Sequence, residues 1–276
     1  MEIAAFIRCF ADGLSDLEGV PPALARPRYE ALCAGFAPAD PPGLRVMDER
    51  LAGVAIRRFT PRRCLPGSVL FVHGGGWSLG SVTSHHGVAA SLAAQLDREV
   101  ISVDYRLAPE ADYATMLADC RTVAEAIAPQ ALVGDSAGGR LVLDLAWEPT
   151  SPAWPLGLIY PPVGTPDTVA LGPDAPLLSR DEILTLWRAI APTLPPVPET
   201  PPSQRIEVLA VEHDPLTHPL EAAVAEWRRR GARVGYRRAP GMVHGALHAQ
   251  AHLAPMGEAW RDFCRALAGG LEAPRP

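Results

Sequence analysis

Lysine is absent from the sequence, and all 25 basic residues are arginine. A Schiff-base lysine or any other lysine nucleophile is therefore excluded, as is a phosphate-binding loop of the Gly-Lys-Ser/Thr type. The net charge of −6 is modest, so we do not expect nucleic acid to be a partner.

Cysteine is scarce, and long apolar runs are missing. The five cysteines are Cys9, Cys33, Cys64, Cys120 and Cys264. Their odd number and wide scatter argue against a disulfide framework or a structural zinc site. No run approaches the roughly 18 apolar residues that a membrane span needs. The first residues lack the basic start of a signal peptide, because Glu2 precedes Arg8. We expect a cytoplasmic protein with no stable membrane insertion.

Short β-type runs alternate with helical patterns along most of the chain. The runs occupy residues 54–59, 68–72, 99–103, 131–133, 156–160, 206–211 and 233–237. Several are continuously apolar, as in strands buried on both faces. This alternation predicts an α/β fold, with a mostly parallel, doubly wound sheet of about eight strands flanked by helices. The functional site should lie beyond the carboxyl ends of the strands.

Helical and loop segments can be placed around these strands. Leu216, Leu220, Val224 and Trp227 form one apolar helix stripe. Arginines 228–230 then close that helix with positive charge, and we favour this reading over a nucleic-acid patch. Residues 3–35 are weakly helical, and a proline-rich stretch at 38–42 separates them from the rest. The prolines of residues 192–202 predict a loop.

Residues 134–138, Gly-Asp-Ser-Ala-Gly, follow the predicted strand at 131–133 and precede a helical pattern. This is the Gly-x-Ser-x-Gly elbow in its strand–turn–helix setting. The strained turn exposes Ser136 above the sheet, which makes it the candidate nucleophile. A glycine-rich turn that happens to contain a serine is the alternative.

A second glycine-rich segment, His-Gly-Gly-Gly-Trp at residues 73–77, follows the predicted strand at 68–72. Bare backbone N–H groups in such a loop can form an oxyanion hole. A flexible loop without function is the alternative. We expect His73 to position the loop and not to act as a catalyst.

Asp214 and His244 complete a candidate catalytic triad. Each follows a predicted strand, and the chain order Ser136, Asp214, His244 is the one that this arrangement needs. His244 would take the serine proton, and Asp214 would fix the histidine tautomer.

Other residues compete for these roles. Glu212 is the rival acid, whereas Asp135 points the wrong way for a triad partner. The rival histidines are His213, His218, His248 and His252. His244, His248 and His252 could share one helix face and bind a metal, but no acid cluster accompanies them.

Five motifs in order give the sequence a family resemblance. They are residues 73–77, residues 104–110 (Asp-Tyr-Arg-Leu-Ala-Pro-Glu), residues 134–139, residues 214–216 and residues 244–245. Together they resemble the bacterial hormone-sensitive-lipase-like esterases of the α/β-hydrolase fold. The resemblance covers about residues 45–268, within a single domain spanning 1–276.

The resemblance implies several further features. Gly74, Gly75 and Ala137 would supply the oxyanion N–H groups, and residues 1–40 would form a small helical cap. No cofactor or metal is implied. Arg140 departs from the family, which usually has asparagine there, and short segments flank the elbow. Because of these departures, the resemblance does not predict the shape of the cap or the size of the acyl pocket.

We therefore predict a serine carboxylesterase that hydrolyses short- to medium-chain acyl esters of a small molecule through an acyl-enzyme, as a monomer or a homodimer. An amidase, a deacetylase or an acyltransferase with the same triad is the alternative. A non-catalytic ligand receptor is a further alternative, although such receptors usually lose a triad residue.

Overall fold

The computed structural model describes residues 1–272. Its strands are β1 (Arg45–Leu51), β2 (Val54–Thr60), β3 (Leu65–Val72), β4 (Arg98–Asp104), β5 (Ala131–Asp135), β6 (Leu156–Ile159), β7 (Arg205–His213) and β8 (Arg233–Val243). Its α-helices are α1 (Ile3–Ser15), α2 (Pro22–Ala34), α3 (His86–Leu96), α4 (Tyr113–Ile127), α5 (Ser136–Ala146), α6 (Arg180–Ile190), α7 (Thr217–Arg229) and α8 (Ala254–Glu272). Two short 3₁₀ turns are η1 (Ala191–Thr193) and η2 (Ala246–Ala249).

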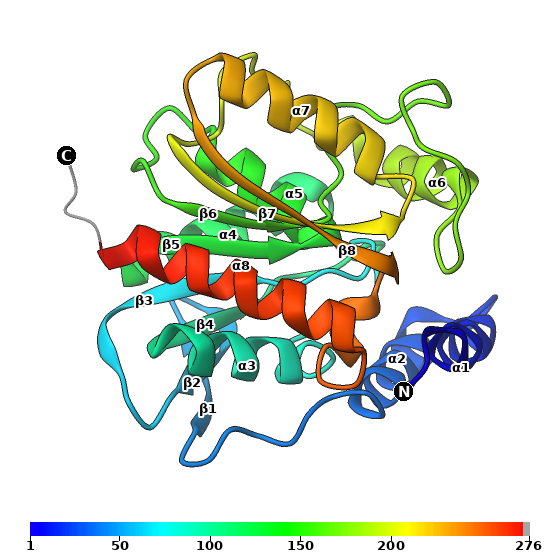
Figure 1. Cartoon of the computed structure of the whole chain (residues 1–276), viewed down its shortest axis with the longest axis horizontal. Coiled ribbons are helices and arrows are strands. Elements are labelled where there is room, and N and C mark those ends of the chain that lie inside the picture. Colours follow the sequence, from blue (N-terminus) through cyan, green and yellow to red (C-terminus); the bar gives the residue numbers. More distant parts are fainter. Residues whose placement is uncertain (273–276) are drawn as a thin grey trace.

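All eight strands join one sheet in the order β1-β2-β4-β3-β5-β6-β7-β8 (Figure 1). The pairs β1–β2 and β2–β4 are antiparallel, and every other neighbouring pair is parallel. The predicted α/β-hydrolase fold with a mostly parallel sheet of about eight strands is confirmed.

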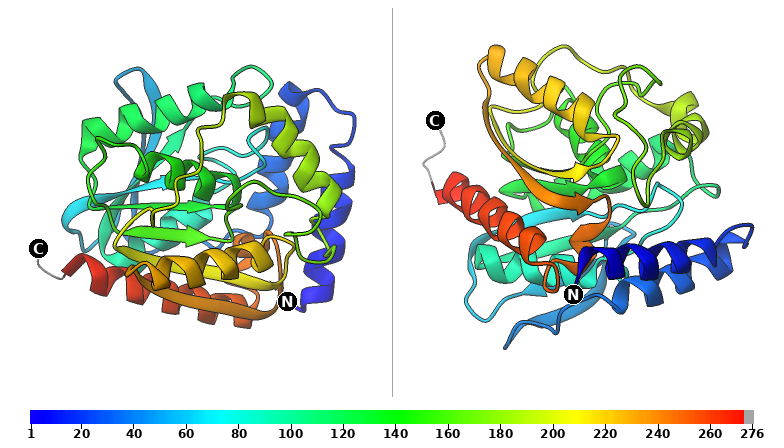
Figure 2. Two further views of the ribbon diagram at one scale, coloured as in Figure 1. Left: turned by 90° about the horizontal axis from the view of Figure 1, so that it is seen from above. Right: turned by 45° about the vertical axis from the view of Figure 1, so that its right-hand side comes forward.

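Helices cover both faces of the sheet (Figure 2). On β3, Val69 and Phe71 pack in the buried cluster beneath α3 and α8. Leu70 and Val72 pack on the other face, against α4, α5 and α7. Successive strand side chains point to opposite faces, so a strand buried on both faces must be apolar throughout. This explains the unbroken apolar run in the sequence.

Strand β1 was not predicted, because its residues are mostly exposed and four of its seven are charged. It forms as a hairpin with β2, through a turn in which Ala52 and Gly53 have φ values of 47° and 89°. Positive φ at both central residues suits the right-handed strand twist. The pairing thus depends on the turn and on the neighbouring strand, and no apolar run signals it.

The structure adds detail at the other end of the sheet and in the proline-rich segment. The run predicted at residues 233–237 extends to Val243 in β8, which is an edge strand of the sheet. The loop predicted at residues 192–202 begins inside the 3₁₀ turn η1 and is otherwise irregular.

Helices α1, α2 and α6 lie beyond the carboxyl ends of the strands (Figure 2, right). Phe6 and Phe10 of α1 pack on Phe36, with ring centroids 5.1 and 5.8 Å away. These rings belong to the same buried cluster as α3 and α8. Helix α6 begins with a capping box, in which the side chains of Ser179 and Glu182 each bond the other residue's backbone N–H.

Within residues 1–272, none of the helices combines the length and the apolar character that crossing a membrane would require.

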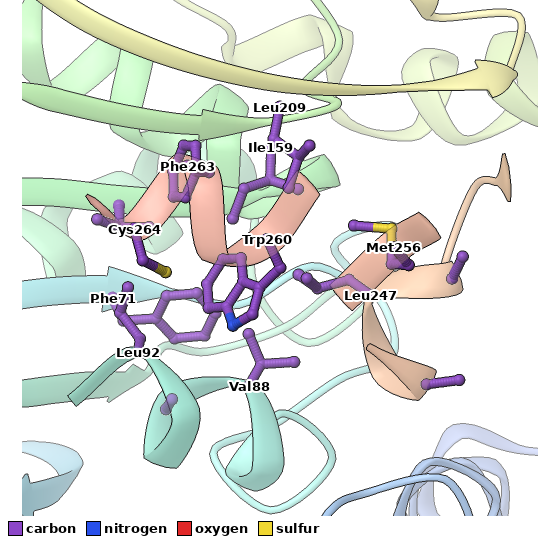
Figure 3. Close-up of a cluster of buried hydrophobic side chains, with 14 of the residues drawn as sticks. Phe71, Val88, Leu92, Ile159, Leu209, Leu247, Met256, Trp260, Phe263 and Cys264 are labelled. Carbon is purple, nitrogen blue, oxygen red and sulfur yellow. The ribbon is translucent and has the colours of Figure 1, made fainter. Parts of the chain in front are cut away.

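Trp260 of α8 lies at the centre of the core between the sheet and α3 (Figure 3). Its side chain is fully buried among Phe71, Val88 and Leu92. Its indole N–H donates a hydrogen bond to Ser91 Oγ at 2.9 Å. One side chain thus holds α8 to both the sheet and α3.

Truncation of Trp260 should therefore be costly. We expect Trp260→Ala to lower the free energy of unfolding by about 3–5 kcal/mol, since it removes a large buried side chain and leaves a cavity. Urea titration measures this change. Val169→Ala, at a side chain that is 88% exposed, is the matched control and should change it by no more than about 0.5 kcal/mol. A loss below about 1 kcal/mol for Trp260→Ala would contradict this description of the core.

Candidate active site

Ser136 lies at a sharp turn between β5 and α5, where the sheet meets the pocket. Its φ of 49° is in the left-handed region, a backbone conformation that costs a non-glycine residue about 1–3 kcal/mol. A Cβ on Gly134 would lie 2.6 Å from the Gly138 carbonyl oxygen, and one on Gly138 would overlap the Val72 carbonyl. Only glycine fits at both positions, so the motif spacing is a steric requirement of this turn.

The three residues of the predicted triad come together in the structure. The Ser136 hydroxyl donates to His244 Nε2 at 2.9 Å. His244 Nδ1–H donates in turn to Asp214 Oδ2 at 2.7 Å. The Asp214 side chain is fully buried, whereas that of His244 is 14% exposed. The buried carboxylate therefore selects the tautomer that leaves Nε2 free to accept the serine proton.

Asp214 is held by the chain that follows β7. Its Oδ1 accepts the Leu216 N–H at 2.8 Å, and its backbone oxygen accepts the Thr217 N–H at 3.0 Å. The Tyr160 ring lies 4.5 Å from the imidazole of His244, centroid to centroid. Both triad partners of Ser136 are thus fixed by neighbours and do not depend on a bound ligand for their positions.

The glycine loop after β3 lies beside the elbow. The Gly74 N–H donates to Asp135 Oδ1 at 3.0 Å, so this donor is already engaged. Gly75, Gly76 and Ala137 line the pocket together with Ser136, and Gly74 does not. Within residues 1–272 no acceptor is recorded for the Gly75 or Gly76 N–H. Ala137 is the second residue of α5, where an N–H has no partner within the helix.

His73 is fully buried behind this loop and does not line the pocket. Its Nδ1 lies 2.9 Å from the Gly74 carbonyl oxygen. Its ring stacks on Tyr105 at a centroid distance of 4.3 Å, and the Tyr105 hydroxyl donates to the His73 carbonyl. These contacts hold the loop and place His73 apart from the reacting atoms.

A buried polar cluster adjoins the elbow. Asp135 Oδ2 lies 3.3 Å from His85 Nε2. The His85 and His248 rings are 4.6 Å apart, and Tyr29 Oη lies 3.4 Å from His248 Nε2. Burial opposes ionisation of Asp135, but the neighbouring histidines, His85 foremost, hold its pKa below the usual range. Asp135 therefore stays charged and supports the glycine loop through Gly74.

Sequence reasoning missed Tyr29 and His85, which both line the pocket. Neither belongs to a motif that the sequence analysis identified, and each reaches the site only through packing. Asp135 was considered only as a triad partner; it points to Gly74 and His85 and makes no contact with His244.

Of the rival acid and histidines, His248 lines the pocket but contacts Tyr29 and His85, whereas Glu212, His213, His218 and His252 lie outside the pocket lining. Glu212 is bonded to the Gly241 N–H, and His218 to the Ala170 carbonyl. His213 and His252 are exposed. The segment around His248 forms the 3₁₀ turn η2 and not an α-helix, so the three histidines at 244, 248 and 252 do not share a helix face. Among residues 1–272, no group of three potential ligands could hold a metal ion.

The pocket above Ser136 has a volume of about 480 Å³, within the range of small-molecule sites. Ser136 and His244 face it. One wall is contributed by α6 and the preceding loop, with Leu186 and Trp187. The opposite wall is contributed by Phe10 of α1 and Tyr29 of α2. A small, largely apolar ligand would therefore be enclosed between the two helical segments.

Comparison with known proteins agrees with this geometry. Residues 69–248 match the family defined by the alpha/beta hydrolase fold. The carboxylesterase NlhH of Mycobacterium tuberculosis is 31% identical over 247 residues, covering 75% of this chain and 77% of that protein. The esterase LipI of the same organism is 30% identical over 191 residues, covering 58% and 59%.

Solved structures of an esterase and a lipase have the same fold as this chain. The hyperthermophilic esterase from the archaeon Pyrobaculum calidifontis has a TM-score of 0.78 and 26% identity, covering 92% of this chain and 95% of that one. A hormone-sensitive lipase from a metagenome library has a TM-score of 0.81 at 19% identity and covers 99% of both chains. The second likeness concerns the fold alone.

The parallel sheet with a serine at a strand–helix elbow defines a hydrolase of the α/β-hydrolase fold, and the chain belongs to that family. Its 31% identity to the carboxylesterase NlhH, over three quarters of the chain, agrees with the esterase resemblance of its motifs.

The buried histidines should make the protein sensitive to acid. Burial, with a smaller contribution from His85, lowers the pKa of His73 and of His248 to about 3. An unfolded histidine binds its proton below about pH 6.5. Between these values the unfolded state binds more protons, so stability falls as the pH falls. We expect a loss of about 2 kcal/mol for each histidine between pH 7.5 and pH 5.

Urea titrations at the two pH values measure this loss. His248→Gln should remove about half of the combined loss of the two histidines, because one of them no longer resists protonation. His252→Gln, at an exposed histidine, is the control and should leave the loss unchanged. An unchanged pH dependence in His248→Gln would contradict a neutral, buried His248.

Proposed function

We propose that the protein is a serine carboxylesterase in which Ser136 is the nucleophile, His244 the general base and Asp214 its orienting acid. One observation carries the assignment: a continuous hydrogen-bonded path runs from Ser136 Oγ through the imidazole to a buried carboxylate, over 2.9 and 2.7 Å. A serine hydroxyl is a weak nucleophile until such a base removes its proton.

The reaction proceeds in two halves. Ser136 Oγ attacks the ester carbonyl carbon while His244 Nε2 takes the hydroxyl proton. The tetrahedral intermediate collapses to an acyl-enzyme, and His244 returns that proton to the departing alcohol. Water then attacks the acyl-enzyme with His244 as base, and the acid leaves as Ser136 regains its proton. Asp214 stabilises the imidazolium in both halves and does not change its own protonation.

We assign the oxyanion donors to the N–H groups of Gly75, Gly76 and Ala137. Gly76 replaces Gly74 in the set expected from the sequence, because the Gly74 N–H bonds Asp135 and the residue lies outside the pocket lining. One such donor typically lowers the barrier by about 3 kcal/mol. We further propose that α1, α2 and α6 form the cap over the site, of which only the first two lie within residues 1–40.

An ester is the favoured substrate. The relatives NlhH and LipI are named carboxylesterase and esterase, which favours an ester over an amide. A receptor on this scaffold is disfavoured by the intact hydrogen bonds of all three triad residues. We propose a small-molecule acyl ester of short to medium chain as substrate, with no cofactor.

The remaining proposals concern setting and assembly. All five cysteines are free, which fits the reducing cytoplasm as the location. We propose a monomer or a homodimer that does not bind nucleic acid, in keeping with the net charge of −6.

Replacement of Ser136 tests the mechanism. Ser136→Ala should lower the kcat/KM for p-nitrophenyl acetate and butyrate by at least about 10⁴-fold, because no other group forms the acyl-enzyme. The melting temperature should not fall. A fluorophosphonate probe should label the wild-type protein and fail to label the variant.

Ser68→Ala is the matched control, since Ser68 lies in the amino-terminal half of β3 and does not line the pocket. It should keep both turnover and labelling. Undiminished ester hydrolysis by Ser136→Ala would overturn the assignment of the nucleophile.

A further inference from the structure

Arg140 of α5 is one turn beyond the nucleophile and is completely buried. A buried guanidinium is costly unless its donors are satisfied. Its Nε donates to Asp144 Oδ2 at 2.8 Å, and its Nη1 donates to the Gly164 carbonyl at 2.8 Å. Tyr113 Oη donates to the same Asp144 oxygen at 2.6 Å. Asp144 thus pairs with Arg140 within α5, whereas Arg140 Nη2 and Asp144 Oδ1 have no hydrogen-bond partner within residues 1–272.

The guanidinium also lies against α6. Its central carbon is 5.1 Å from the centroid of the Trp187 ring, a distance at which a cation is attracted to an indole face. Trp187 and Ile190 are the buried side chains that α6 adds to the cluster beneath α4 and α5. Arg140 therefore ties the helix that carries Ser136 to the segment that covers the pocket.

Trp187 is one wall of the pocket, and it packs edge-on against Trp77 with ring centroids 6.1 Å apart. Trp77 directly follows Gly76, one of the assigned oxyanion donors, and also lines the pocket. The pair of indoles consequently stands next to the place where the ester carbonyl must lie. An ester arm that enters the pocket on this side meets the Trp187 ring.

We propose that Arg140 is a positioning residue that holds Trp187 as the size limit of the pocket on the α6 side, so that Trp187 sets the length of the ester arm that lies there. This inference rests on the proposed esterase function. The opposite wall, formed by Phe10, Leu14 and Tyr29, takes the other arm of the ester.

The first test removes the wall. Trp187→Leu keeps an apolar side chain in the cluster but is smaller. In one of two ester series, we expect it to raise the ratio of kcat/KM for an eight-carbon arm over a two-carbon arm by at least about tenfold, the scale at which a pocket discriminates between chain lengths. Two series are measured, p-nitrophenyl esters of increasing acyl length and acetates of increasing alcohol length. The ratio should rise in the series whose variable arm faces α6.

Ile190→Ala is the matched control, because Ile190 is buried on the same helix but does not line the pocket. It should leave both ratios unchanged. An unchanged ratio in both series for Trp187→Leu would overturn the size limit.

The second test asks whether Arg140 acts through Trp187. Arg140→Met combined with Asp144→Leu removes both charges together, so neither is left buried alone. Arg140→Gln, which can still bond Asp144, is the milder variant if the pair fails to fold. Each should raise the same ratio as Trp187→Leu and change the near-ultraviolet circular dichroism of the indoles.

In the Trp187→Leu background the Arg140 variants should add no further change to the ratio, since two residues that act through one contact are not additive. A full, independent effect in that background would overturn the positioning role, and so would a loss of stability with the ratio unaltered. Failure of the proposed function looks different, because the wild-type protein would then hydrolyse no ester in either series.

Discussion

The hydrogen bond from the Gly74 N–H to Asp135 is the constraint on which the active site depends. It joins the loop after β3 to the elbow after β5, two segments that are 61 residues apart in sequence. This contact holds the glycine loop, which carries the proposed oxyanion donors, beside Ser136. Asp135 holds the Gly74 N–H firmly because it is buried yet charged, beside His85. An ionised acceptor makes a stronger hydrogen bond than a neutral one.

Buried charges recur on both sides of Ser136. Asp135 precedes Ser136 and faces the glycine loop and the histidine cluster, whereas Arg140 follows it and faces α6. Each charge is matched by an opposite or polar group within the described structure: His85 for Asp135 and Asp144 for Arg140. Such pairs add little net stability, but they are costly to break. Buried charge pairs of this kind can therefore hold neighbouring segments in one place. The strained backbone at Ser136 depends on that rigidity.

Much of this could be predicted from the sequence, for identifiable reasons. The interior strands are buried on both faces, so they appear as apolar runs. The elbow needs glycine at residues 134 and 138 for steric reasons, so it appears as a motif. Strand β1 could not be predicted, because its pairing follows from a turn and its residues are exposed and charged. The 3₁₀ turn at His248 was equally hidden, since a four-residue histidine spacing fits an α-helix as well.

The sequence by itself determined the fold class and predicted Ser136 as the nucleophile with its two partners in chain order, because these depend on local sterics and on the order of strands in a parallel sheet. Only the tertiary structure decided which N–H groups are free, since a donor's availability depends on a carboxylate from another segment. Only the tertiary structure likewise placed the Arg140 guanidinium against the Trp187 ring. Those contacts join residues that are 47 or more positions apart, and no local pattern in the sequence encodes such a distance.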